Sequence, residues 1–302
     1  MKNKKLNNPF IIVLIIYFIC YALHIAEYFF LRTDETLIGE AVIHKILGIV
    51  ILAIACKKFG YSAGEIGFKK GKDFFSLIKG LAFGAGVFLI AYAAESIIAV
   101  SNGTFESLQL YVSAYAIDKN IGNRTELIFF VICIIGNIIN VIMEEGNFRG
   151  LFVKLLGTKH SFMVSAVISS VLFGFWHVMG PVRNYTDGEQ SFNGMIVNAI
   201  FLLVASALVG LKFTMLTKMS GNLYFSMADH FFNNTIVNLL HVVTETGADE
   251  LMTVRVSIAQ TISFAIVLIC YCKWRKKYAA DNERKPECGG TGSNDRVQGA
   301  YV

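Results

Sequence analysis

Apolar segments of membrane-spanning length dominate this chain. A helix needs roughly 17 to 25 predominantly apolar residues to cross a bilayer. Eight segments meet that requirement, and they cover about residues 9–30, 40–56, 78–100, 126–147, 161–180, 192–211, 222–243 and 253–272. Lipid offers no partners for exposed backbone groups, so a spanning chain must form helices or a closed barrel. We expect an all-α fold, a polytopic transmembrane helical bundle of about eight helices.

The composition favours one membrane domain. Hydrophobic residues make up 55% of the 302 residues and charged residues 16%, whereas soluble domains average about 45–50% and about 25%. The chain has three prolines and no long linker before residue 275. We predict a single transmembrane domain over residues 1–275. The polar, basic tail at 276–302 should be cytoplasmic and disordered.

Lysines and arginines are unevenly divided between the connecting segments. Sixteen of them, Lys212 included, fall in segments on one side of the predicted bundle and five on the other. Positively charged loops remain in the cytoplasm, so we expect both termini to be cytoplasmic. This bias accounts for the formal net charge of +5 without a basic surface domain, and we therefore expect no nucleic-acid partner.

Two connections carry expectations of their own. The loop at 57–73 is basic and punctuated by glycines, which fits either a segment lying on an anionic inner leaflet or a plain solvated connector. The connection at 101–124 is the longest on the opposite side. Within it, Leu108 to Ile117 could form a short amphipathic helix at the interface.

The six cysteines form no CxxC pair and no metal-ligand spacing. Four of them lie in or at the ends of apolar runs, and Cys272 and Cys288 lie near or in the tail. We expect packing residues or free thiols.

Charge interrupts one of the most apolar runs. Glu144, Glu145 and Arg149 continue the helix predicted from about Thr125, and ionisable groups at membrane depth indicate a functional site. Glu145 and Arg149 are four residues apart and can pair on one helix face. Glu144 points about 100° away from Glu145 and needs another partner.

A helical hairpin predicts that partner. Apolar spacing continues the helix to a cap at Gly157, and the next helix begins near His160. Glu145 lies 16 residues before Ser161 and His177 lies 16 residues after it. In an antiparallel pair with equal rise, the carboxylate and the imidazole therefore reach the same height. A lone histidine near a helix end is more often a packing residue, but the matched depth favours a functional role.

The seventh segment contains a third polar pair. His230 and Asn234 are four residues apart and share one helix face. Both side chains can donate hydrogen bonds, which a developing oxyanion requires. The alternative is a hydrogen bond that holds two helices together.

Other polar residues in the apolar segments favour structural or interfacial roles. They are His24, Glu27, Lys45, Glu95 and His241. Glu95, in the third segment, is the one most worth testing.

Three motifs on three helices resemble one known family. Glu144-Glu145-x-x-x-Arg149, Phe173-x-x-x-His177 and His230-x-x-x-Asn234 are similar to the motifs of the CPBP intramembrane proteases. That family includes CAAX-processing endopeptidases and bacterial Abi proteins linked to bacteriocin maturation and self-immunity. The resemblance covers about residues 125–240, and the Phe-Arg-Gly ending at 148–150 also matches. Gly146-Asn147 departs from the bulky apolar residues usual there, which could loosen the helix beside the acids.

The resemblance implies a catalytic set. Glu144 and His177 would activate the attacking water, and His230 with Asn234 would stabilise the tetrahedral oxyanion. Glu145 and Arg149 would have supporting roles. No cofactor is then needed.

Zinc is the alternative. Glu144, His177 and His230 could form the two-histidine, one-carboxylate set of metalloproteases. The HExxH motif is absent, however, and Asn234 would be a poor zinc ligand.

The leading function is therefore an intramembrane endopeptidase of the CAAX type in a multi-pass, integral membrane location, in a bacterial cell membrane if the Abi-like resemblance holds. Its partners would be the lipid bilayer and a leader-type peptide or membrane-protein substrate. A non-catalytic scaffold or bacteriocin self-immunity protein of the same fold is the alternative. Transport is disfavoured, because the polar residues gather in one place instead of following a pathway through both halves.

Overall fold

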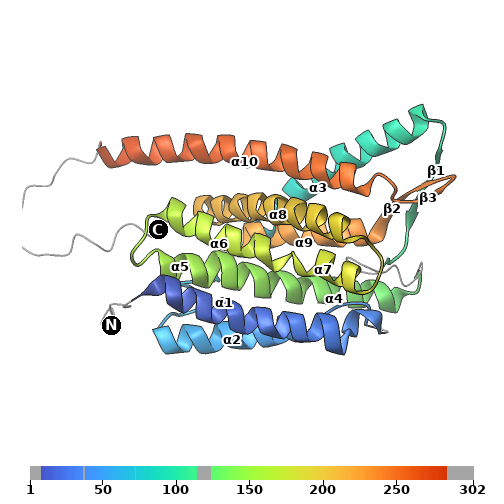
Figure 1. Ribbon diagram of the computed structural model, residues 1–302. Helices are drawn as coiled ribbons and strands as arrows, with labels where there is room; N and C mark the ends of the chain where they lie inside the picture. The colour runs from blue at the N-terminus through green and yellow to red at the C-terminus, as the bar shows by residue number, and fades with distance from the viewer. Residues whose placement is uncertain (1–7, 37, 72, 114–123, 284–302) are drawn as a thin grey trace, which may run out of the picture.

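The computed structural model describes residues 8–36, 38–71, 73–113 and 124–283, in which helices run side by side as one bundle (Figure 1). This confirms the all-α membrane fold. The α-helices are α1 Pro9–Ala26, α2 Ile43–Phe59, α3 Asp73–Ser101, α4 Leu127–Glu144, α5 Val153–Leu156, α6 Phe162–Trp176, α7 Met179–Thr186, α8 Phe192–Ser220, α9 Tyr224–Leu239 and α10 Met252–Glu283. Short helical turns are η1 Glu27–Leu31 and η3 Glu145–Phe152, both π-helical, and η2 Thr33–Glu35, a 3-10 helix.

Six helical stretches in the described residues are long and apolar enough to cross a membrane. They are Pro9–Glu35, Phe74–Ser101, Leu127–Leu156, Phe162–Thr186, Phe192–Ser220 and Met252–Lys277. The other two expected spans correspond to α2 and α9, which have 17 and 16 residues. Eight crossings therefore stay a prediction.

The first and last helices end at the same side of the bundle. Helix α1 begins and α10 finishes at the same end of the bundle (Figure 1), so the described start and finish of the helical domain are consistent with the expected orientation. The assignment of that side to the cytoplasm stays a prediction. The tail expected to be disordered from residue 276 is helical as far as Glu283, and residues 284–302 lie outside the described residues.

A small sheet covers the opposite end of the bundle. Strands β1 (Phe105–Leu110), β2 (Leu240–Thr244) and β3 (Gly247–Ala248) pair antiparallel in that order. The expected amphipathic helix from Leu108 is therefore wrong over the described residues, and residues 114–123 lie outside them. The seventh helix also stops at Leu239, short of the expected 243. The run Val242-Val243-Thr244 is β-branched, which favours a strand over a last helical turn.

The core lies where the helix hairpin of α4 to α6 meets α1 and α2. Phe148, Leu151 and Phe152 are almost fully buried in it, and the Phe148 ring packs edge-on against Phe173 at 5.1 Å. Helix α8 approaches α6 closely at Gly174, which has no side chain. A Cβ placed on this residue would lie 2.4 Å from the Leu203 carbonyl oxygen. Helix α9 packs along α3 on the other side.

The basic loop after α2 is packed against the bundle. Ile66 is 5% exposed and belongs to the main core, and the Leu223 amide donates to the Gly67 carbonyl at 3.0 Å. Gly67 has a φ of 112°, which an L side chain rarely adopts. The interpretation as a plain solvated connector is therefore wrong for this part of the loop.

The described cysteines are free thiols. Cys20, Cys56 and Cys133 are buried, while Cys270 and Cys272 are exposed. This agrees with the expected packing and free-thiol roles, and Cys288 lies outside the described residues.

Candidate active site

The two adjacent glutamates lie at a change of helix type. Helix α4 ends at Glu144 and continues as the π-helical turn η3, and single π turns occur frequently at functional sites. A Cβ on Gly146 would lie 2.6 Å from Leu52 Cδ2, so this glycine lets η3 approach α2. Asn147 Nδ2 donates to the carbonyls of Met143, at 2.9 Å, and Gly48. Gly146 and Asn147, where loosening of the helix was expected, lie in a π turn. The hydrogen bond from Asn147 to Gly48 holds this turn against α2.

Both carboxylates reach one imidazole. His230 Nδ1 lies 3.0 Å from Glu145 Oε1, and His230 Nε2 lies 3.5 Å from Glu144 Oε2. All three side chains are buried, with Glu145 at 0% exposed. Ideal α-helical geometry had placed the two glutamates about 100° apart, so sequence reasoning missed their shared partner. Asn140 Nδ2 also donates to Glu144, at 3.4 Å.

Arg149 forms the predicted pair with Glu145. Its Nη1 lies 3.3 Å from Glu145 Oε1, and its guanidinium lies 3.8 Å from the centre of the Phe173 ring. This face-on contact is a cation–π interaction. Helix α8 leaves room for the guanidinium at Gly210, where a Cβ would approach Arg149 Nη2 to 3.2 Å.

His177 caps the end of α6 and joins the cluster through Phe173. Its Nδ1 donates to the Phe173 carbonyl at 2.8 Å. A carbonyl only accepts hydrogen bonds, so Nε2 carries the lone pair when the ring is neutral. The Phe173 ring lies 4.6 Å from the His177 ring and 6.2 Å from the His230 ring.

His177 and Glu144 are near each other but form no direct hydrogen bond or ion pair among the described residues. His177 interacts electrostatically with Glu144 and His230.

Asn234 lies one helical turn beyond His230 on α9. Its Oδ1 accepts a hydrogen bond from Asn233 Nδ2 at 3.1 Å, and the residue is half-buried. Within the described part of the chain it forms no hydrogen bond with either glutamate, His177 or His230. The structure therefore brings Glu144, Glu145, Arg149 and His230 into contact, places His177 beside them, and leaves Asn234 at the edge.

The donors for the alternative zinc set do not converge. Among the described residues, no group of three or more His, Cys, Asp and Glu side chains is placed to hold a metal ion. Glu144 and His230 are neighbours, but His177 directs Nδ1 to a carbonyl and makes no direct contact with either of them among the described residues.

Two charged residues near the cluster were missed from the sequence. Lys212, counted there as a cytoplasmic loop residue, is 1% exposed inside α8, and its Nζ pairs with Asp229 Oδ2 at 2.9 Å. The loop assignment is wrong because α8 continues to Ser220. Phe213, beside Lys212, stacks on the His230 ring at 4.7 Å. Asp229 precedes His230 in an apolar helix, and that buried charge was the available clue.

The other polar residues of the apolar segments have partners elsewhere. Glu27 accepts from His44 Nδ1 at 2.7 Å, and Glu95 pairs with Arg255 Nη1 at 2.7 Å. Lys45 pairs with Glu40. These contacts are consistent with the structural roles expected for them.

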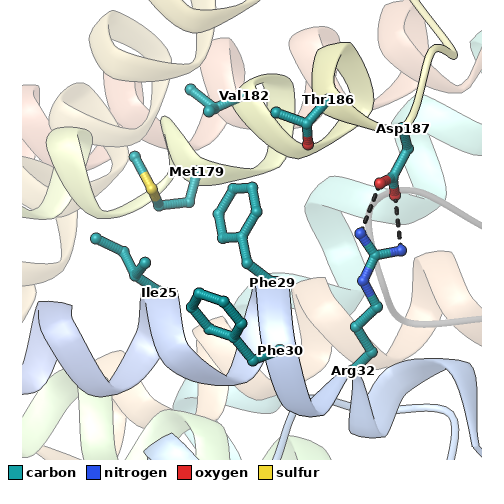
Figure 2. A pocket seen from close by; sticks show the side chains of 8 residues that line it. All are labelled: Ile25, Phe29, Phe30, Arg32, Met179, Val182, Thr186 and Asp187. Carbon is teal, nitrogen blue, oxygen red and sulfur yellow. Dashed lines mark hydrogen bonds and ion pairs between the residues drawn. The ribbon is translucent and has the colours of Figure 1, made fainter.

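A surface pocket lies apart from the polar cluster. It has a volume of about 510 Å³ and opens between the end of α1, η1 and α7 (Figure 2). Arg32 and Asp187, which form an ion pair at 2.6 Å, stand at one side of it. Its other walls are Ile25, Phe29, Phe30, Met179, Val182 and Thr186. None of the candidate catalytic residues lines it.

Comparison with known families identifies the helices that carry the cluster. Residues 126–236 match the family model described as type II CAAX prenyl endopeptidase Rce1-like, and no curated protein matches the chain. The match runs from the start of α4 into α9, so it contains all three motifs. Residues 126–236 are therefore similar to the CAAX-processing endopeptidases, and this similarity supports an intramembrane protease family of that type.

Proposed function

We propose that this protein is an intramembrane endopeptidase in which Glu144 and His177 activate a water molecule to hydrolyse a peptide bond. The observation that carries the proposal is the contact of Glu144, Glu145 and His230 among apolar helices. Burying charge there is costly and is tolerated mainly where it serves function. The family match supports peptide hydrolysis as the reaction.

The proton transfers can be assigned to atoms. A water between Glu144 and His177 donates one hydrogen bond to a Glu144 oxygen and the other to His177 Nε2. Glu144 accepts a proton as the water oxygen bonds to the carbonyl carbon. It then returns this proton to the amine nitrogen as the C–N bond breaks. A carboxylate within hydrogen-bond reach of the water can serve as base in the first step and as acid in the second.

The remaining residues would stabilise the intermediate. The 3.5 Å separation of His230 Nε2 from Glu144 is long for a hydrogen bond. With Nδ1 donating to Glu145, the imidazolium form of His230 would donate from Nε2 to the oxyanion. Asn234 would be the second donor. Glu145, held between Arg149 and His230 Nδ1, would orient the imidazole.

The proposed substrate is a membrane-associated peptide. The matched family is named for prenylated CAAX chains, and a leader peptide or a membrane-anchored C-terminus presents similar chemistry at the bilayer. We place the protein in a bacterial cell membrane, on the Abi-like resemblance of its motifs. Its partners are then lipid and the substrate chain.

Cleavage by purified protein tests the proposal. Detergent-purified wild type and Glu144→Ala are incubated with two quenched fluorescent peptides, a farnesylated CAAX peptide and its unprenylated counterpart. Membrane peptidomics of host cells with and without the gene supplies further candidates as accumulated uncut precursors. Wild type should cleave at least one peptide and Glu144→Ala none. Equal cleavage by the two proteins would contradict the proposal and favour the scaffold or self-immunity alternative.

Chelation separates the metal-free mechanism from the zinc alternative. Wild type dialysed to completion against a strong chelator should keep its cleavage rate. A rate that disappears and returns when Zn²⁺ is added would contradict glutamate chemistry without metal.

A further inference from the structure

A directional chain of hydrogen bonds ends on Asn234. Lys212 Nζ, from α8, donates to Gln260 Oε1 of α10 at 3.2 Å. Gln260 Nε2 donates to Asn233 Oδ1 at 2.9 Å, and Asn233 Nδ2 donates to Asn234 Oδ1 at 3.1 Å. Three helices therefore contribute to the setting of one carboxamide.

The direction of this chain is fixed by its first member. A lysine ammonium can only donate, whereas a primary amide accepts through oxygen and donates through nitrogen. Gln260 must therefore present its oxygen to Lys212 and its nitrogen to Asn233. The same constraint passes along to Asn234, whose oxygen is engaged and whose NH2 group remains to donate elsewhere. Across the described residues, that NH2 group donates no hydrogen bond.

Lys212 is held firmly enough to set this direction. Its side chain is 1% exposed, and its Nζ lies 2.9 Å from Asp229 and 3.2 Å from Ser263 Oγ. Together with Gln260, these contacts give the ammonium group one ion-pair partner and two hydrogen-bond acceptors. A hydrogen bond from an ionised donor is stronger than a neutral one, and it polarises the bonds that follow it.

We propose that Lys212 and Gln260 are positioning residues that keep the Asn234 NH2 group turned toward the reacting carbonyl oxygen. This inference rests on the proposed role of Asn234 as an oxyanion donor. Without the chain, the two orientations of the amide differ little in energy, and one of them presents an oxygen to the oxyanion. Gln260 lies outside the matched residues 126–236, so α10 contributes to the site from beyond the family segment.

Gln260→Glu provides a sharp test because it keeps the size and reverses the polarity. Glutamate still accepts from Lys212, but it cannot donate to Asn233. Asn233 then turns its NH2 to the new carboxylate, and Asn234 turns its oxygen outward. We expect kcat to fall about 100-fold or more, comparable to the loss of an oxyanion donor, with KM little changed. Gln260→Leu removes the chain without reversing it and should cost about 10-fold, the scale of one hydrogen bond.

A purely structural role predicts the opposite order. Gln260→Glu would then be the milder change, because it adds a salt bridge to Lys212 and preserves the packing. Gln190→Glu is the matched control, since Gln190 also accepts from one residue, Asn198, and donates to another, Pro181. Its cleavage rate should equal that of wild type. Rates are measured with the peptide that wild type cleaves in the test above.

Asn234→Ala separates the two levels of the proposal. In that background, Gln260→Glu should lower kcat no further. Full activity of Asn234→Ala alone would overturn the oxyanion role itself. A low kcat for Asn234→Ala combined with wild-type kcat for Gln260→Glu would overturn only the positioning role. If Gln260→Glu does not fold, unchanged kcat in Gln260→Leu overturns that role equally well.

Discussion

Two buried polar clusters, one at the sheet end of the bundle and one at the glutamate pair, use the same residue types with different geometry. In the sheet-end cluster, Arg255 Nη1 lies 2.7 Å from Glu95 and 3.0 Å from Asp249. His241 joins Asp249 at 2.5 Å and the Tyr111 carbonyl at 3.0 Å. Every contact is short, and together they tie α3, β2 and α10 to the chain beyond β1.

The glutamate-pair cluster contains two longer contacts beside the one of 3.0 Å between Glu145 and His230. Glu144 is 3.5 Å from His230, and Glu145 is 3.3 Å from Arg149. Arg149 is stabilised chiefly by the faces of Phe173 and Phe213. Short contacts favour stability, whereas longer contacts leave charged groups able to engage a substrate. The first cluster is therefore consistent with a structural role and the second with the proposed catalytic role.

His177→Gln should give the largest effect in the comparison. Glutamine can keep a hydrogen bond to the Phe173 carbonyl but is a weaker acceptor than the imidazole Nε2, which orients the water for proton transfer to Glu144. We expect kcat to fall by about 100- to 10,000-fold, the range for a general acid or base. The unfolding midpoint in detergent should stay near that of wild type. A rate within a few fold of wild type would place His177 outside the reaction.

Arg255→Met should show the opposite pattern. It leaves Glu95 buried without its cation, and breaking a buried pair from one side costs about 3–5 kcal/mol. The free energy of unfolding, followed by denaturant titration in mixed micelles, should drop on that scale. Cleavage at a temperature where the variant is folded should be unchanged. Lys273→Met, an exposed position on the same helix, is the control for loss of positive charge.

His241→Phe should have a smaller effect on stability. Phenylalanine can keep the stacking on the Tyr111 ring, 3.8 Å away, but it loses both ring hydrogen bonds. An unsatisfied buried partner costs about 1–3 kcal/mol. Thermal unfolding should report that loss, with no change in kcat. A larger fall in kcat than in stability would link this cluster to catalysis.

The pH dependence of Asp249 should give the smallest effect. Burial alone would raise its pKa, but the His241 hydrogen bond and the Arg255 charge outweigh it and hold the pKa below its usual 3.8. The ionised form therefore stabilises the fold fully above the unfolded pKa of about 3.9. This stabilisation is lost as the pH falls through the lower folded pKa. Between pH 5 and about 3, the midpoint should fall more in wild type than in Asp249→Asn, and equal slopes would contradict this.

The sequence predicted the parts of the fold that depend on hydrophobic length and helical spacing. The helix hairpin capped at Gly157 and the pairing of Glu145 with Arg149 follow from periodicity. The end of α9 did not, because the apolar run continues into β2 and hydropathy does not distinguish strand from helix there.

Contacts across helices were harder to predict than contacts along one helix. The π turn that begins at Glu145 changes the direction of the side chains, and no proline in this segment marks the change in the sequence. The contact of both glutamates with His230 and the burial of Lys212 depend on how α8 and α9 pack. His230 lies 85 residues from Glu145 in the sequence. The sequence nevertheless identified the charged residues Glu144, Glu145 and Arg149, because charge in an apolar run itself indicates a functional site.

The most direct test compares Glu144→Gln with Glu95→Gln, the same change in the two clusters. Single-turnover cleavage and the unfolding midpoint are measured on both proteins in the same detergent. The proposed roles predict that Glu144→Gln loses cleavage and keeps its midpoint, while Glu95→Gln keeps cleavage and loses stability. Cleavage by Glu144→Gln at the wild-type rate would contradict the assignment of the active site.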